Sequence, residues 1–193
     1  SGVPCIGLSN QAAINHPLAP KPNRPDRPSQ WISRNYAPAD RAIGMHYSSF
    51  DSNIFTPIIR QSVRQLNPIR NGHYCVYLPS YSNVNILRTL RRLPQWQWKV
   101  FSKTSHTAKT YGNVEILPID TDAFLSYLVS CNGIICNAGF GVTTEALYLG
   151  KKMLVIPMKN QYEQQCNASA LAGMGVKVFD SFHPGNSAAF EKW

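Results

Sequence analysis

From residue 73 onward, short apolar runs alternate with longer segments of helical periodicity. The expected strands cover residues 73–78, 98–102, 113–118, 133–137, 152–157 and 176–179, and the expected helices cover residues 83–93, 122–131, 141–150 and 162–174. Short runs rich in Val, Ile and Leu, separated by helices, are typical of parallel strands that are buried on both faces. Right-handed crossovers then place helices on both sides of the sheet. The sequence therefore predicts an α/β fold with a Rossmann-like parallel sheet.

The chain before residue 73 lacks this regular alternation. Residues 3–8 are apolar and predict a strand, which leads into an irregular, proline-rich loop. A second strand is expected at residues 41–48, and residues 51–70 contain a short amphipathic stretch before the turn signal Asn71-Gly72. We expect this region to connect a further structural unit to the main domain.

The composition indicates a folded protein with an anionic partner. Hydrophobic residues make up 44% of the 193 residues and charged residues only 15%, which is too few charges for a disordered chain. The 19 Lys and Arg residues exceed the 10 Asp and Glu residues, giving a formal net charge of +9. Such a charge favours a phosphorylated ligand, a nucleic acid or an acidic lipid surface without choosing among them.

The cysteines and histidines show no metal-binding pattern. Five cysteines occur without C-x-x-C spacing, and the five histidines are scattered, so we expect buried thiols of a reduced cytosolic protein and no structural zinc. No apolar run approaches the roughly 18 residues that span a bilayer, and no signal-peptide pattern precedes the first strand. The abrupt start at Ser1-Gly2 is typical of an artificial boundary or of a cut inside a longer protein.

The strongest local signal is the turn that follows the apolar strand at 133–137 and opens the next helix. In it, Gly139 and Gly141 allow the backbone to approach a ligand closely, and the Thr143 and Thr144 hydroxyls can add hydrogen bonds. A diphosphate would bind here, because ligands of open α/β sheets lie at the carboxyl ends of strands and a helix N-terminus favours anions. The alternative is a generic glycine-rich turn with a threonine cap.

Two further groups of polar residues strengthen this interpretation. Glu145, one turn into the same helix, can accept hydrogen bonds from the hydroxyls of a ribose, although an acid near a helix N-terminus is also favourable by itself. One strand later, Pro157 is followed by a cluster of amides and a carboxylate suited to the hydroxyls of a neutral sugar. The cluster comprises Asn160, Gln161, Glu163, Gln164 and Gln165. Its alternative role is a solvated helix start.

The run from Asn137 to Val176 resembles the C-terminal donor-binding segment of GT-B glycosyltransferases. Within that superfamily it looks like family 28 and the lipid-linked N-acetylglucosaminyltransferase of peptidoglycan synthesis. The match follows the spacing from the glycine turn through Glu145 to the strand Pro157 and then Gln-x-x-Asn-Ala. A weaker resemblance extends from Ile54 to the end, and residues 2–11 resemble the last strand of the acceptor domain. This resemblance implies that residues 1–50 are a remnant of the acceptor domain with a linker, and that residues 51–193 are the donor-binding domain.

The resemblance also assigns roles to individual residues. It implies contacts with the donor diphosphate from Gly139, Phe140, Gly141, Thr143 and Thr144, with the ribose from Glu145, with the transferred sugar from Gln161, Glu163 and Gln164, and with the base from Phe101, Ser102 and Ile119. The loop that contains Ser80 and Tyr81 is expected near the phosphates. The donor is expected to be a uridine diphosphate sugar, bound without a metal or other cofactor.

The implied reaction is an inverting transfer of the sugar to an acceptor hydroxyl. The helix N-terminus stabilises the departing diphosphate, and the general base comes from the N-terminal domain. We therefore name no catalytic base and expect the isolated chain to bind donor with little or no transfer activity. His16 is the nearest candidate for the base, but a structural or exposed histidine is the commoner case.

Alternative functions remain open at this point. A nucleotide-sugar epimerase of GT-B fold would use the same diphosphate site, and a non-catalytic subunit would bind the donor for another chain. The basic helix with Arg88, Arg91 and Arg92, beside Trp96 and Trp98, is interpreted as a solvated face that permits contact with anionic lipid. Such contact would suit a lipid-linked acceptor at the cytoplasmic face of a membrane. We expect no nucleic-acid partner, because charge is its only support.

Overall fold

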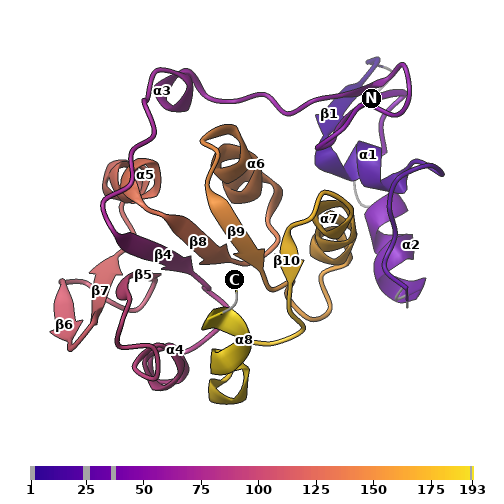
Figure 1. Ribbon diagram of the computed structural model, residues 1–193. Coiled ribbons are helices and arrows are strands. Elements are labelled where there is room, and N and C mark those ends of the chain that lie inside the picture. Colours follow the sequence, from indigo (N-terminus) through magenta and orange to yellow (C-terminus); the bar gives the residue numbers. More distant parts are fainter. Residues whose placement is uncertain (1–2, 24–26, 36–37, 192) are drawn as a thin grey trace.

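The computed structural model describes residues 3–23, 27–35, 38–191 and 193. Within these residues the chain forms a seven-stranded sheet and a separate three-stranded sheet. A connecting segment joins them and runs along the top of the view in Figure 1, above two of the helices that cover the larger sheet. The N-terminal region and the region from residue 73 onward therefore each form a sheet of their own.

The larger sheet has the strand order β10-β9-β8-β4-β5-β7-β6. Its strands are β4 His73–Tyr77, β5 Gln97–Ser102, β6 Lys109–Tyr111, β7 Val114–Pro118, β8 Gly133–Cys136, β9 Lys152–Val155 and β10 Lys177–Val178. Every neighbouring pair is parallel except β6 with β7, which is antiparallel. The predicted Rossmann-like parallel sheet is confirmed, with one antiparallel edge strand that the sequence analysis missed. All three β6 residues are exposed, so no apolar pattern announces that strand.

Helices cover both faces of this sheet, as predicted (Figure 1). They are α4 Asn83–Leu90, α5 Thr121–Ser130, α6 Phe140–Tyr148, α7 Tyr162–Gly173 and α8 Ser187–Glu191. Successive strand residues point to opposite faces, so Ile134 packs with the α5, α6 and α7 side chains, whereas Ile135 packs with those of α4 and α8. The short helix α8 was not predicted, yet its Phe190 is fully buried and stacks on Phe182 at 5.2 Å between ring centroids.

The smaller sheet is built from the N-terminal part of the chain. Its strands β1 Ile6–Ser9, β2 Arg41–Met45 and β3 Ile54–Phe55 are all parallel, in the order β1-β2-β3. The sheet thus reaches Phe55, beyond the division that we placed after residue 50, and that division stays a prediction.

Two helices occupy much of the segment that we predicted as an irregular loop, so that prediction was wrong there. They are α1 Asn10–Asn15 and α2 Arg27–Asn35. Helix α1 begins where the Ser9 hydroxyl accepts a hydrogen bond from the Ala12 amide at 3.0 Å, an N-cap that the many prolines obscured. Proline at the start of α2 is tolerated, because the first amides of a helix have no intrahelical partner. Residues 24–26 of the expected loop lie outside the described residues.

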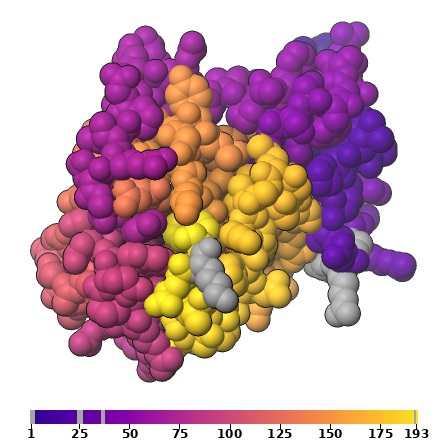
Figure 2. Space-filling model, viewed as in Figure 1, coloured from indigo at the N-terminus to yellow at the C-terminus, as the bar shows by residue number. Residues whose placement is uncertain are grey.

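The N-terminal helices attach this part of the chain to the main sheet. Ile14 of α1 forms a small buried cluster with Tyr162 and Cys166 of α7. On its other side α1 contacts β2 closely, because a Cβ at Gly44 would lie only 2.8 Å from the Cα of Ala13. Gly44 therefore sets the distance between α1 and the small sheet. Figure 2 shows the N-terminal residues as a lobe beside α7.

The connecting segment between β3 and β4 contains the short helix α3 Gln61–Arg64. Val63 is fully buried in the core beneath it. Further along, the ammonium group of Lys151 donates to the carbonyl oxygens of Ile69 at 2.8 Å, Val129 at 2.6 Å and Cys131 at 2.9 Å. These contacts hold the segment against α5 and β9. None of the helices among the described residues has both the length and the apolar character that a membrane span requires.

Candidate functional site

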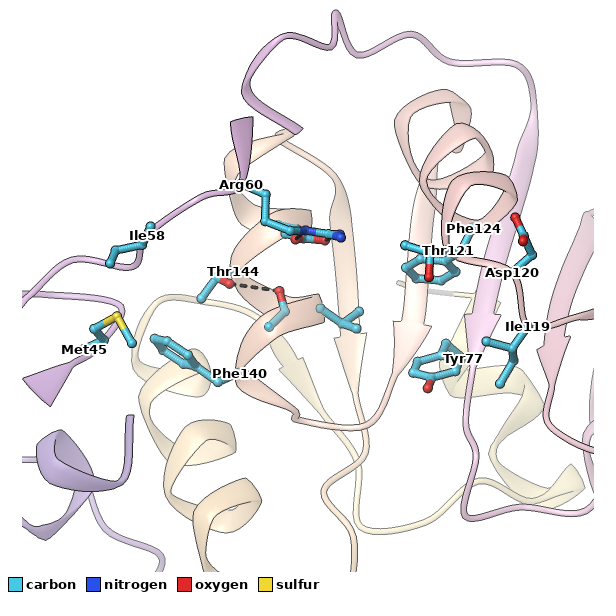
Figure 3. Close-up of a pocket in the computed structure, with 13 residues that line it drawn as sticks. Met45, Ile58, Arg60, Tyr77, Ile119, Asp120, Thr121, Phe124, Phe140 and Thr144 are labelled. Atoms are coloured by element: carbon cyan, nitrogen blue, oxygen red, sulfur yellow. Dashed lines mark hydrogen bonds and ion pairs between the residues drawn. The ribbon is translucent and has the colours of Figure 1, made fainter. Parts of the chain in front are cut away.

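A cavity of about 540 Å³ opens at the carboxyl ends of β4, β7 and β8. Three parts of the chain line it: the start of α5, the first two turns of α6, and residues from the small sheet and the connecting segment (Figure 3). The lining residues are Met45, Ile58, Arg60, Tyr77, Ile119, Asp120, Thr121, Phe124, Phe140, Gly141, Val142, Thr144 and Glu145. In the space-filling view, α6 reaches the surface between the connecting segment and the N-terminal lobe (Figure 2).

The N-terminus of α6 faces this cavity. Gly139 is the N-cap residue and, having no side chain, provides no capping hydrogen bond, so the first amides of the helix are not satisfied by a cap. Neither Gly139 nor Gly141 has a positive φ, and a Cβ at either position would meet no atom within 4 Å. The backbone of the turn therefore does not require glycine at either position. They leave open space above the helix start.

The two threonines of the first turn differ in orientation. Thr143 is fully buried, and its hydroxyl bonds the Tyr47 hydroxyl at 2.7 Å and donates toward the Gly139 carbonyl at 2.8 Å. Burial raises the pKa of Tyr47 well above its ordinary value. Thr143 thus faces the protein interior and does not line the cavity. Thr144 does line it, although its hydroxyl donates to the Gly141 carbonyl at 2.9 Å.

Glu145 is paired with an arginine that the sequence analysis missed. Arg60 donates from Nε to one carboxylate oxygen of Glu145 at 2.7 Å and from Nη2 to the other at 2.9 Å. The Glu145 side chain is 12% exposed and that of Arg60 is 50% exposed. This bidentate pair stands at the cavity wall and joins the connecting segment to α6. An isolated arginine in a linker has no spacing that would have announced this role.

Of the three residues expected near the base, only one lines the cavity. Ile119 does so, beside Asp120, which caps α5 by accepting a hydrogen bond from the Ala123 amide at 2.8 Å. Phe101 instead lies in the core, edge-to-face with Phe124 at 5.0 Å between ring centroids. The buried Ser102 hydroxyl bonds that of Thr104. The strand Gln97–Ser102 therefore ends behind the cavity wall rather than in the cavity.

The side chains of the loop after β4 form hydrogen bonds with neighbouring loops. Ser80 donates to the side-chain oxygen of Asn137 at 3.2 Å, and the Asn137 amide donates to the Ile156 carbonyl at 2.7 Å. The Tyr81 hydroxyl accepts a hydrogen bond from the Phe182 amide at 3.0 Å. Neither Ser80 nor Tyr81 lines the cavity. Both hold neighbouring loops in place.

The expected sugar-binding residues border a different cavity, of about 380 Å³, between the N-terminal helices and the start of α7. Gln161 and Glu163 line it, and both residues are exposed. Gln164 does not line it. Its side-chain oxygen accepts from the Met158 amide at 3.0 Å, and its nitrogen donates to Gln161 at 2.8 Å. None of the three residues lines the cavity at α6.

Two other expectations concern residues outside both cavities. His16 accepts a hydrogen bond from the Leu18 amide at 3.3 Å and lies 3.7 Å from an Asp51 oxygen. Arg88, Arg91 and Arg92 are exposed on and after α4, as a solvated helix face requires. Among the described residues, no group of three or more His, Cys, Asp or Glu side chains could hold a metal ion.

The cavity lies at the carboxyl ends of parallel strands and at a helix N-terminus, which is where open α/β sheets bind their ligands. The profile of glycosyl transferase family 1 matches residues 2–188, and the chain belongs to this family. No curated protein matches the sequence. The family-level resemblance to glycosyltransferases is confirmed, whereas its narrower form, the likeness to family 28, stays a prediction.

One of the solved glycosyltransferase structures that are similar to the chain shares the fold. The glycotransferase of kitacinnamycin is 23% identical with a TM-score of 0.55, over 74% of this chain and 41% of that one. SnogD from Streptomyces nogalater is 18% identical with a TM-score of 0.46, over 84% and 43%. The spinosyn rhamnosyltransferase SpnG, complexed with thymidine diphosphate, is 17% identical with a TM-score of 0.45, over 81% and 42%. The chain spans about two fifths of the length of these structures.

Proposed function

We propose that the chain binds a nucleotide-diphosphate sugar in the cavity at the N-terminus of α6 and serves as the donor side of a glycosyltransferase. The observation that carries this proposal is the position of Glu145. Its carboxylate lines the cavity one turn beyond a helix start whose amides have no capping side chain. Family membership supports transfer of a glycosyl group as the reaction.

The parts of the donor fit different walls of the cavity. The unpaired amides at Phe140, Gly141 and Val142 would bind the diphosphate, because a helix N-terminus combines N–H donors with a partial positive charge. Glu145 would accept hydrogen bonds from the ribose hydroxyls with the lone pairs that remain on its oxygens. The base would lie toward Ile119, and uracil is the base that we propose.

The proposed chemistry is an inverting displacement at the anomeric carbon. An acceptor hydroxyl forms the new glycosidic bond while the bond to the diphosphate breaks, and the negative charge that develops on the leaving group is stabilised by the α6 amides. The sugar would point toward Gln161, Glu163 and Gln164 at the start of α7. We propose no catalytic base from this chain, and we propose that the chain alone binds donor without rapid transfer. A lipid-linked acceptor and contact with a membrane surface remain further predictions.

Calorimetric titration with UDP, dTDP and UDP-linked sugars tests the proposal. Glu145→Gln should weaken UDP binding by about tenfold, since a charged hydrogen bond contributes about 1.5–3 kcal/mol and tenfold corresponds to about 1.4 kcal/mol. Glu115→Gln is the matched control, because Glu115 is also paired with a basic side chain, Lys99, but lies outside the cavity. Absence of saturable UDP binding at millimolar concentration, or equal effects of the two variants, would refute the proposal.

A further inference from the structure

Arg60 is the basic side chain among the described residues that line the α6 cavity, and two carboxylates, Asp120 and Glu145, line it as well. A nucleoside diphosphate carries at least two negative charges near neutral pH. Without Arg60 such a ligand would enter a cavity whose ionised lining groups are all negative, and like charges at short range disfavour binding. A cation in the cavity therefore adds to the partial positive charge of the α6 N-terminus in binding the proposed ligand.

We propose that Arg60 binds the donor diphosphate together with the α6 amides, while its pairing with Glu145 holds the guanidinium at the cavity wall. This inference rests on the proposed function and adds a residue from the connecting segment to the donor site. Arg60 is thereby a binding and specificity residue that selects phosphorylated ligands over nucleosides. Two contacts of its fork go to Glu145, one from Nε and one from Nη2.

The geometry of the side chain supports this role. A guanidinium carries five N–H donors, so two bonds to Glu145 leave three that can bind phosphate oxygens. Figure 3 shows the Arg60 side chain extending into the cavity toward Thr121 and Phe124. Its 50% exposure leaves the outer edge of the fork accessible, whereas the 12% exposure of Glu145 keeps the carboxylate fixed behind it.

The position of Arg60 in the chain adds a second argument. It is the N-cap residue of α3, and Val63 in that helix is fully buried, so the backbone that carries the guanidinium is held by core packing. A binding group on a packed support loses little entropy when a ligand arrives. Arg64, later in the same helix, is exposed and lines a different cavity, beside Tyr148 and Met174. It provides a matched control.

Two simpler roles for Arg60 predict different results. If the pair only ties the connecting segment to α6, removing the guanidinium lowers stability and leaves the preference for phosphates unchanged. If Arg60 blocks Glu145 from the ligand, removing it strengthens nucleotide binding. The proposed role predicts weaker binding of UDP with little change for uridine, which lacks phosphates.

The experiment compares UDP and uridine by ligand-observed NMR and calorimetry on the wild-type chain, Arg60→Gln, Arg60→Lys and Arg64→Gln, with thermal melts to confirm folding. We expect Arg60→Gln to weaken UDP binding about tenfold, uridine affinity to stay within about twofold, and Arg60→Lys to fall between, because lysine keeps the charge but loses the planar fork. Arg64→Gln should match the wild type.

Unchanged or tighter UDP binding in Arg60→Gln would overturn the inference, as would equal losses for UDP and uridine. A wild-type chain that binds no UDP would overturn the proposed function itself and this inference with it. If the wild-type chain binds UDP and Arg60→Gln binds it equally well, only the inference about Arg60 is overturned. Arg60→Lys keeps the test decisive if Arg60→Gln fails to fold.

Discussion

Replacing Lys151 by methionine should destabilise the fold through three backbone carbonyls. The ammonium group donates to Ile69, Val129 and Cys131 at 2.6–2.9 Å, and the residue is only 7% exposed. In the variant, the Val129 carbonyl still accepts a hydrogen bond from the Ile69 amide at 3.0 Å. The carbonyls of Ile69 and Cys131 lose the hydrogen bond from the ammonium group. An unsatisfied buried acceptor costs about 1–3 kcal/mol. Burial lowers the pKa of Lys151, which shows that the buried ammonium group is destabilised by desolvation. Removing the charge relieves this desolvation and offsets part of the loss. We therefore expect a net loss of about 2–4 kcal/mol.

Urea denaturation followed by circular dichroism measures this loss as a lower midpoint at an unchanged slope. A melt should fall by roughly 5–15 °C, because 1 kcal/mol shifts a domain of this size by about 2–4 °C. Lys152→Met is the matched control, since Lys152 is the next residue and is exposed. If Lys151→Met stays within about 0.5 kcal/mol of that control, the three hydrogen bonds do not hold the connecting segment and our reasoning is wrong.

Two further predictions concern pH and packing. Burial lowers the pKa of both His46 and His73 below 6.5, so below that pH the unfolded chain binds more protons than the folded one. The free energy of unfolding should therefore fall as pH drops from 7 toward 5, by up to about 1.4 kcal/mol per pH unit for each histidine. Urea titrations at several pH values measure this slope, and His46→Gln should reduce it. A free energy of unfolding that does not change with pH would contradict the prediction. Gly44→Ala should cost about 1–3 kcal/mol, because a Cβ there meets the α1 backbone at 2.8 Å. Gly173→Ala, where a Cβ meets no atom within 4 Å, should be neutral or stabilising in the same denaturation assay, and equal effects would argue against the close approach.

Most of the larger sheet could be predicted because its strands are buried on both faces and therefore read as continuous apolar runs. The runs at residues 133–137 and 152–157 correspond to β8 Gly133–Cys136 and β9 Lys152–Val155. The strand β6 escaped prediction since all its residues are exposed and only pairing with β7 defines it. Helix α1 escaped because it has six residues, too few for periodicity to emerge from a segment rich in proline.

The candidate site was predictable only where it is local in sequence. Phe140, Gly141, Thr144 and Glu145 belong to one turn and one helix, so the strand–turn–helix pattern was enough to bring them to the cavity. Phe101 and Ser102 were assigned by likeness to a strand end, and the packing of that strand directs them into the core. Orientation of this kind depends on neighbours that a single sequence does not reveal.

Arg60 is the part of the candidate site that the sequence did not predict. It pairs with a carboxylate 85 residues later in the chain, and no short-range spacing encodes such a contact. The same connecting segment is held near its other end by Lys151 through the Ile69 carbonyl. A segment fixed at two points has little freedom left to lose when a ligand binds its exposed guanidinium. The connection between the two sheets is therefore part of the wall of the α6 cavity, and we expect the loss of either fixed point to change the shape of that wall.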